Sequence, residues 1–206
     1  MLNSLPRVML LRLWHSKQQS KTLRTQIGAC TQTEEIPFIT TTADTDPTVE
    51  EVRVDMAGMK VASMPVELVT SVGSCVAICI HDLTNKCGGL AHIMLPDSSV
   101  FPHELLPSKF ADTAVPALAQ KIRQINGKKA PLLAKIAGGA NMFPNLRSDS
   151  LSVGEKNIES VKAALAAHKV KLLAEDIGGT FGRRISFNVV TGVVTIRRFK
   201  GEIKKL

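Results

Sequence analysis

Two short apolar runs separated by a polar break place the strongest restriction on the fold of this chain. Residues 75–80 and 90–95 are largely apolar, whereas residues 82–86 between them are mostly polar and lead to Gly88-Gly89. Runs of this length, bounded by turn residues, are typical of buried β-strands. A connection this short joins neighbouring antiparallel strands, so we predict that the two runs pair as a hairpin.

Further strands and two helices are predicted from the periodicity of the remaining sequence. An apolar stripe at helical spacing predicts an amphipathic helix over residues 109–125, and a shorter stripe predicts another over residues 155–168. Strands are expected at four further places and in a second hairpin that turns at Thr191-Gly192. Their residues are 50–54, 66–72, 132–136, 170–174 and 185–198.

The composition indicates one folded domain with an extension. Hydrophobic residues make up 44% of the 206 residues and aromatic residues 4%, which is typical of a compact α/β or layered β domain rather than of a disordered chain. The formal net charge is +8, but five basic residues precede the first acidic residue, Glu34. The rest of the chain is therefore only mildly basic, which argues against nucleic acid as a partner.

We divide the chain into a flexible, basic and polar N-terminal extension, residues 1–49, and a domain over residues 50–206. The acid-poor start of the extension fits an organellar transit peptide, a basic contact arm or translation from an upstream start codon. Arg7 and Arg12 interrupt its apolar stretch and no small-residue cleavage site follows, so we expect no secretory signal. The four cysteines do not suggest a disulfide framework and no apolar run is long enough to span a bilayer. A cytoplasmic location is expected.

The segment Gly73-Ser74-Cys75 places a thiol behind two small residues at the start of the first apolar run. Small neighbours let a substrate carbonyl approach, and backbone N–H groups there can receive an oxyanion. Taken alone, Cys75 fits a buried structural cysteine better, because free cysteines are among the most buried residues. The predicted hairpin, however, brings His92 beside Cys75, where an imidazole can take the thiol proton. We therefore predict Cys75 and His92 as a catalytic pair.

Other kinds of site fit the sequence less well. Cys75, Cys79, His81, Cys87 and His92 lie close together, but their spacing in strand-like runs differs from the paired close ligands of structural zinc sites. We expect Cys79 and Cys87 to be packing residues. The three glycine pairs lack the arrangement of nucleotide-binding loops, and we expect them to form tight turns and close backbone approaches around a cleft. The basic C-terminal segment lacks interleaved aromatic residues and is expected to be a solvated face.

Six segments, taken in order and spacing, carry a resemblance to a known family: residues 73–79 (GSCVAIC), 88–96 (GGLAHIMLP), 110–114 (FADTA), 134–143 (AKIAGGANMF), 154–157 (GEKN) and 176–179 (DIGG). The chain resembles the chemoreceptor glutamine deamidase family CheD over about residues 52–198. Six matching segments in the same order and spacing are not explained by chance.

The resemblance implies hydrolysis of receptor glutamine amides to glutamate, with Cys75 as nucleophile and His92 as base. It implies an α/β fold of the α+β type, with a layered mixed β-sheet or β-sandwich core flanked by helices, similar to toxin-type cysteine deamidases. No metal or organic cofactor is expected. The implied partners are methyl-accepting chemotaxis receptors, as substrate, and the CheC phosphatase, without nucleic acid and without membrane insertion.

One position departs from the family pattern. Members often carry a threonine six residues before the cysteine, which helps to orient the histidine, and Val69 stands there in this chain. A one-residue bulge would let the adjacent Thr70 serve, since strand side chains alternate between faces; otherwise the third residue is missing or supplied elsewhere. Two other functions stay open: demethylation of receptor glutamyl esters by the same thioester chemistry, and a non-catalytic adaptor that binds CheC or receptors.

Overall fold

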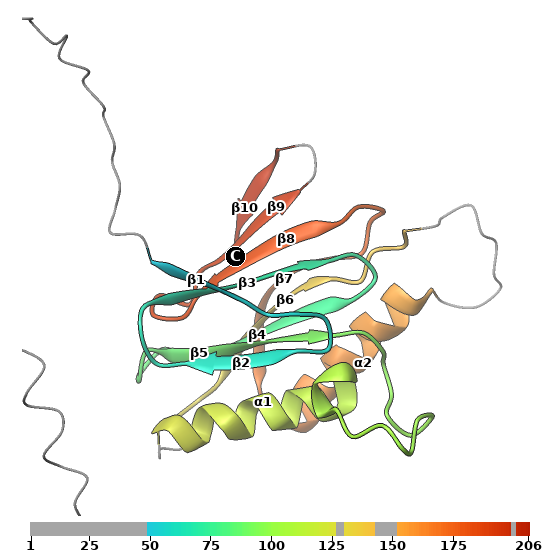
Figure 1. Ribbon diagram of the computed structural model, residues 1–206, viewed down its shortest axis with the longest axis horizontal. Helices are drawn as coiled ribbons and strands as arrows, with labels where there is room; N and C mark the ends of the chain where they lie inside the picture. The colour runs from blue at the N-terminus through green and yellow to red at the C-terminus, as the bar shows by residue number, and fades with distance from the viewer. Residues whose placement is uncertain (1–48, 127–129, 143–151, 199–200) are drawn as a thin grey trace, which may run out of the picture. The chain divides into compact units, whose positions relative to one another are not determined.

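Ten strands occur within the residues that the computed structural model describes, which are 49–126, 130–142, 152–198 and 201–206 (Figure 1). They are β1 (Glu50–Arg53), β2 (Met59–Ala62), β3 (Val66–Val72), β4 (Val76–Asp82), β5 (Cys87–Ile93), β6 (Leu133–Gly138), β7 (Lys171–Ile177), β8 (Arg183–Asn188), β9 (Val194–Arg198) and β10 (Ile203–Lys205). They pair into two five-stranded sheets, with the orders β1-β3-β8-β9-β10 and β2-β5-β4-β6-β7. Both sheets contain parallel and antiparallel pairs.

Two helices cover the outer face of the second sheet, which we call the covered sheet (Figure 1). They are α1 (Ala111–Asn126), preceded by the 3-10 turn η1 (Pro107–Lys109), and α2 (Val153–Ala167). Leu118 and Ile122 of α1 are fully buried against this sheet, and each such side chain contributes about 1.5–3 kcal/mol of hydrophobic stabilisation. The predicted helices over 109–125 and 155–168 are thereby confirmed, with ends that shift by about two residues.

The first sheet packs against the inner face of the covered sheet, and we call it the open sheet because no helix among the described residues lies on its outer face (Figure 1). Alternation along β4 produces both cores: Val76, Ile78 and Ile80 point toward the helices, whereas Ala77 and Cys79 point toward the open sheet. A strand buried on both faces reads as a continuous apolar run, which is the pattern that predicted it.

Both predicted hairpins are confirmed. β4 and β5 pair antiparallel with Ala77 opposite His92, and β8 and β9 pair antiparallel around the turn at Gly192, whose φ is 71°. The α+β class, with two mixed sheets flanked by helices, is also confirmed. The likeness to toxin-type deamidases stays a prediction.

The structure contains two strands that were not predicted, and it differs from the expectation for one glycine pair. β2 and β10 were not predicted, because each is short and lies at a sheet edge with exposed positions. Gly88 and Gly89 do not form a turn but lie buried inside β5. A Cβ atom on Gly88 would approach the Phe187 ring within 2.9 Å, and one on Gly89 would approach Leu118 within 2.6 Å. These glycines therefore permit close packing on both faces of the strand.

The division at residue 49 stays a prediction, because residues 1–48, which include Cys30, lie outside the described residues. Among the helices that the structure describes, none is long and apolar enough to cross a membrane.

Candidate active site

His92 lies in β5 with its side chain between the two sheets, where only 3% of it is exposed. Its backbone N–H donates to the Gly58 carbonyl at 3.0 Å, so the β1–β2 connection holds the backbone at this point. Its ring Nδ1 lies 2.8 Å from the hydroxyl oxygen of Thr70 on β3 of the open sheet. The imidazole thus bridges the two sheets.

The hydrogen bonds of Thr70 define the tautomer of His92. The Thr70 hydroxyl donates to the Val54 carbonyl at 2.8 Å, and a hydroxyl has only one proton to give. Its oxygen must then accept from His92, which places the imidazole proton on Nδ1. The lone pair of His92 is therefore on Nε2, a buried atom that has no hydrogen-bond partner among the described residues.

Cys75 immediately precedes β4, and its thiol lies on the side of the covered sheet that bears His92. Cys75 and Ala77 both pack in the core between the sheets, whereas Val76 packs toward the helices. Since Ala77 is directly opposite His92, Cys75 is the diagonal neighbour of His92 on the same face. Diagonal neighbours have Cα atoms about 7–8 Å apart, within reach of an imidazole. Cys75 is partly exposed, unlike the buried Cys79 and Cys87.

The loop that carries Cys75 is held by backbone hydrogen bonds from the end of β6. Gly139 N–H donates to the Cys75 carbonyl and Ala140 N–H donates to the Gly73 carbonyl, both at 2.8 Å. Gly138 has φ +121°, and a Cβ atom on it would collide with the Cys75 carbonyl oxygen. Glycine is therefore required at residue 138 both for the backbone angle and for the close approach.

Asn157 of α2 supports the same loop from the helix side. It is fully buried, and its Nδ2 donates to the carbonyls of Ser74 at 3.0 Å and Met94 at 2.9 Å. These two carbonyls belong to the chain just before β4 and just after β5. One amide group therefore ties together the two segments that carry Cys75 and His92.

Burial leaves both candidate groups uncharged at neutral pH. It lowers the pKa of His92 below its ordinary 6.5, with a smaller opposing effect from the Asp55 carboxylate. It also raises the pKa of the Cys75 thiol above its ordinary 9.0, an effect that the cysteine's own backbone N–H partly offsets. The pair is thus a neutral thiol beside a neutral imidazole, and the imidazole can act as a general base when the thiol attacks.

Strand alternation, without a bulge, determines which residue of β3 contacts His92. β3 pairs with β1 and β8 in unbroken register, so the one-residue bulge, one of the two alternatives left open by the sequence, is not present in β3. Thr70 shares the inner face with Leu68 and Val72, both in the core between the sheets, whereas Val69 faces away. The hydroxyl that contacts His92 therefore comes from Thr70.

The other cysteines and histidine of the same stretch are separated from this site. Cys87 points toward the helices and Cys79 points toward the open sheet. His81 lies toward the far end of β4, where its Nε2–H donates to the Val189 carbonyl at 2.7 Å. Within the described part of the chain, no three side chains of His, Cys, Asp or Glu are grouped so as to hold a metal ion. Cys79 and Cys87 are buried, as packing residues are.

Two residues near the site were not singled out from the sequence. Asp55 lines a hollow of about 150 Å³ together with Thr70 and His92, but a lone Asp in a strand connection gives no signal in one sequence. Asn157 was part of a resembling segment, yet a polar residue inside an amphipathic helix usually faces solvent. Only the tertiary structure shows that it faces the loop.

The comparisons with known proteins agree with this picture. The family described as CheD chemotactic sensory transduction matches residues 94–198. A protein from Desulforamulus reducens named "Probable chemoreceptor glutamine deamidase CheD" is 42% identical over 156 residues, which cover 75% of this chain and 94% of that protein. A protein of the same name from Clostridium novyi is 43% identical over 150 residues, 72% of this chain and 93% of its own length.

The fold and the site define an α+β sandwich protein with a thiol just before one strand and an imidazole on the neighbouring strand. The chain belongs to the CheD family.

Proposed function

We propose that this chain is a chemoreceptor glutamine deamidase, a protein-glutamine glutaminase that converts glutamine side chains of methyl-accepting chemotaxis receptors to glutamate with release of ammonia. The observation that carries this proposal is the buried, unpartnered Nε2 of His92, on the face that it shares with Cys75. The names of the relatives support the substrate. A cytoplasmic location and contact with the CheC phosphatase belong to the same proposal.

In the acylation half of the reaction, Nε2 of His92 takes the thiol proton as Sγ of Cys75 attacks the carboxamide carbon. The carbon–nitrogen bond then breaks, and the imidazolium gives that proton to the departing nitrogen, which leaves as ammonia. A thioester on Cys75 remains. Proton transfer by a positioned imidazole accelerates such steps by about 10²–10⁴-fold.

In the deacylation half, His92 takes a proton from water as the oxygen attacks the thioester carbon. The carbon–sulfur bond breaks, Sγ recovers the proton from His92, and the glutamate side chain is released. Thr70 keeps the Nδ1 proton in place throughout, so that Nε2 alone exchanges protons with the reacting atoms. Thr70 is thus a positioning residue, whereas Cys75 and His92 are catalytic residues.

The deciding experiment incubates the purified full chain with the cytoplasmic domain of a chemoreceptor and follows conversion of glutamine to glutamate by mass spectrometry. Cys75→Ala and His92→Ala should abolish conversion. Cys79→Ala removes a buried thiol from β4, the strand that follows Cys75, and should leave conversion intact, so it is the matched control. Undiminished conversion by Cys75→Ala would exclude this cysteine as the nucleophile.

Two alternatives have distinct results in the same assay. An esterase would release methanol from a methylated receptor while leaving glutamines unchanged. An adaptor would convert neither group and would still bind the receptor or CheC when Cys75 is replaced by alanine.

A further inference from the structure

Two exposed arginines lie side by side on the outer face of the open sheet. Arg184 of β8 and Arg197 of β9 are direct cross-strand partners, and we call them the arginine pair. Like charges directly opposite on neighbouring strands destabilise a sheet. An anionic group bound between them would offset this repulsion.

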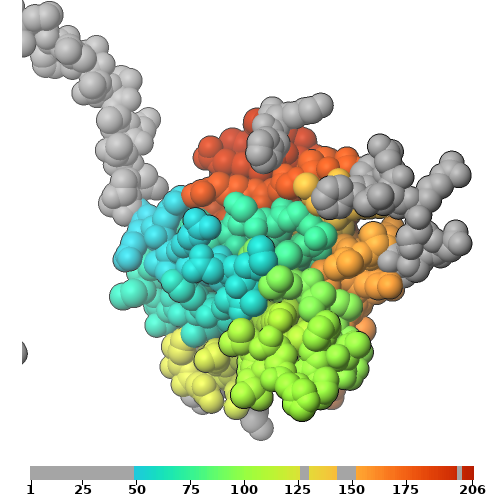
Figure 2. Space-filling view, turned by 45° about the vertical axis from the view of Figure 1, so that its right-hand side comes forward, coloured from blue at the N-terminus to red at the C-terminus, as the bar shows by residue number. Residues whose placement is uncertain are grey.

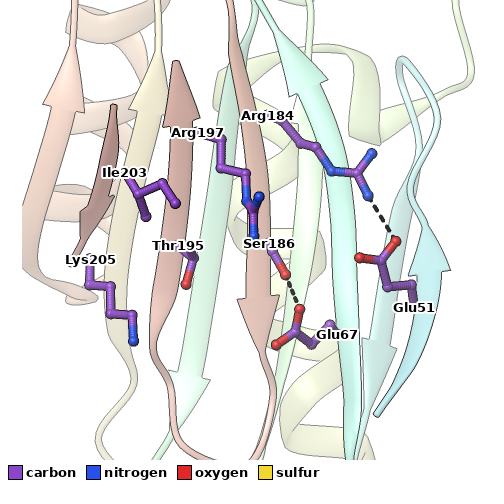
Figure 3. Close-up of a pocket in the computed structure, with 8 residues that line it drawn as sticks. All are labelled: Glu51, Glu67, Arg184, Ser186, Thr195, Arg197, Ile203 and Lys205. Atoms are coloured by element: carbon purple, nitrogen blue, oxygen red, sulfur yellow. Dashed lines mark hydrogen bonds and ion pairs between the residues drawn. The ribbon is translucent and has the colours of Figure 1, made fainter. Parts of the chain in front are cut away.

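Little of the pair's charge is neutralised by neighbouring residues. Arg184 points toward Glu51, 2.8 Å away (Figure 3), but both side chains are about half exposed, and exposed ion pairs contribute at most about 1 kcal/mol. The Glu67 carboxylate accepts a hydrogen bond from Ser186. Arg197 makes no ion pair with any described residue, and Lys205 adds a further cation on the same face (Figure 3). Cations thus gather on β8, β9 and β10.

In the neighbouring pair Arg183 and Arg198, by contrast, a carboxylate neutralises the positive charge. These two arginines are also cross-strand partners, but the buried Asp176 carboxylate accepts from both, at 2.6 Å and 2.7 Å. Arg198 also bonds Glu202. The arginine pair has no buried carboxylate of this kind, so its charge is directed to the solvent.

The arginine pair lies next to the candidate active site. Arg184 and Arg197 line a groove of about 510 Å³ together with Gly73 and Met142, and Gly73 is two residues from the nucleophile. Arg184 also lines the small hollow that contains Thr70 and His92. On the surface seen in Figure 2, the residues of β1–β3, coloured cyan to teal, border those of β8–β10, coloured orange to red. A protein segment that presents a glutamine to Cys75 can therefore extend over the arginine pair.

We propose that the arginine pair binds carboxylates that flank the target glutamine, so that this enzyme prefers glutamines in acidic segments of its protein substrate. This proposal rests on the proposed function, because it assumes that a glutamine side chain occupies the site. Guanidinium groups bind carboxylates in bidentate geometry. The position of Glu51 and Glu67 beside the pair favours an acidic peptide over a nucleic acid, whose continuous phosphate backbone they would repel.

The test uses two fluorescent peptides of equal length, each with one glutamine, which is flanked by glutamates in one peptide and by serines in the other. Binding is measured by fluorescence anisotropy, and deamidation is measured as kcat and KM. The double variant R184Q/R197Q is compared with K121Q/R123Q, which removes the same charge from exposed positions of α1 on the covered sheet. Thermal unfolding confirms that both variants fold.

For the acidic peptide, we expect Kd and KM to rise about fivefold to tenfold in R184Q/R197Q at low salt, and kcat to change less than about twofold. The serine peptide and the K121Q/R123Q control should show no change. Equal binding of the two peptides by the wild-type protein, or equal weakening of both in R184Q/R197Q, would overturn the docking proposal while leaving deamidation intact. Selective binding of the acidic peptide without any deamidation would support docking and contradict the proposed function.

Discussion

The space between the two sheets contains two cysteine–histidine pairs, and only one of them has the properties of a catalytic site. Cys79 and His81 both belong to β4, whereas Cys75 immediately precedes β4 and His92 belongs to the neighbouring β5. Nε2 of His81 bonds the Val189 carbonyl at 2.7 Å, but Nε2 of His92 has no partner among the described residues. His81 is thus occupied by a structural hydrogen bond, and His92 has a lone pair to offer.

The two thiols differ in exposure to solvent. Cys79 is 3% exposed, and burial raises the pKa of its thiol far above 9.0 although the Lys135 ammonium opposes the shift. Lys135 donates to the carbonyls of Gly192 and Leu206, so it too is occupied. Cys75 is partly exposed and lies just before the start of β4. The comparison teaches that a cysteine and a histidine close together do not suffice for a catalytic site. The thiol must also be exposed, and the imidazole must have a nitrogen without a hydrogen-bond partner.

The sharpest way to break this comparison is to make the same substitution in both histidines. His92→Gln should lower kcat/KM for deamidation by about 10²–10⁴-fold, because the general base is lost. His81→Gln should change kcat/KM less than about threefold, and it should lower the free energy of unfolding by about 1 kcal/mol, because the glutamine amide must donate to the buried Val189 carbonyl in place of the imidazole. Urea denaturation and steady-state kinetics measure the two effects. Similar losses of kcat/KM in both variants would contradict the assignment of His92 as catalytic and His81 as structural.

Thr70→Val tests whether the tautomer of His92 depends on its neighbour. The variant keeps the shape of the side chain and removes the hydroxyl, so we expect kcat to fall about tenfold to a hundredfold. KM should stay within about threefold, since Thr70 does not touch the substrate in the proposed mechanism.

Two further variants control for this effect. Thr70→Ser retains a hydroxyl and should recover most of the activity. Adding Val69→Thr to the Thr70→Val variant should not recover it, because residue 69 faces away from His92. Recovery in that double variant would place the third residue at position 69 instead.

Asn157→Ala tests the support that is common to both catalytic segments. Loss of its two hydrogen bonds leaves the carbonyls of Ser74 and Met94 without this donor, and we expect the free energy of unfolding to fall by about 2–3 kcal/mol. Activity should fall only about threefold to tenfold, since Asn157 acts through other residues. Asn157→Asp, which places a buried carboxylate against two carbonyl oxygens, should lower stability at least as much. The exposed Glu159→Ala on the same helix should change stability by less than about 0.5 kcal/mol.

The smallest expected effect is a broad, flat dependence of kcat/KM on pH. As pH rises through the lowered pKa of His92, below 6.5, the base form appears and the rate reaches its plateau. The plateau should extend to about pH 9, because the Cys75 thiol ionises only above its ordinary 9.0. A narrow maximum near neutral pH, or alkylation of Cys75 by iodoacetamide that is already maximal at pH 7, would instead indicate a thiolate–imidazolium pair. Cys79 should be alkylated only after unfolding.

Apart from β1, a short and largely exposed strand that was also predicted, the elements predicted from the sequence have at least one buried or half-buried face. The runs in β4 and β5 and the stripes of α1 and α2 carry clear periodicity, so their type and pairing were predicted correctly. β2 and β10 were missed because each has few residues and an exposed or half-exposed pattern. Short edge strands gain their stability from neighbours that a local pattern does not contain.

The site was predicted less completely than the fold. A hairpin with a defined register was sufficient to bring Cys75 and His92 to one face. The identity of the third residue depended on which face of β3 turns inward, and the family spacing favoured Val69 over Thr70. Asn157 reaches its two carbonyls from 63 and 83 residues away in the chain, a distance over which no local pattern operates.

The backbone conformation at Gly138 affects how the results of mutagenesis on this protein should be interpreted. Any side chain at this residue would have to overlap the carbonyl of the nucleophile's own peptide unit. In a saturation mutagenesis experiment scored by function, residue 138 would appear as intolerant as Cys75, although it takes no part in proton or acyl transfer. Loss of function at such a position reflects a steric requirement of the backbone. Mutagenesis data for this protein would distinguish catalytic residues from structural ones only when folding is measured for each inactive variant.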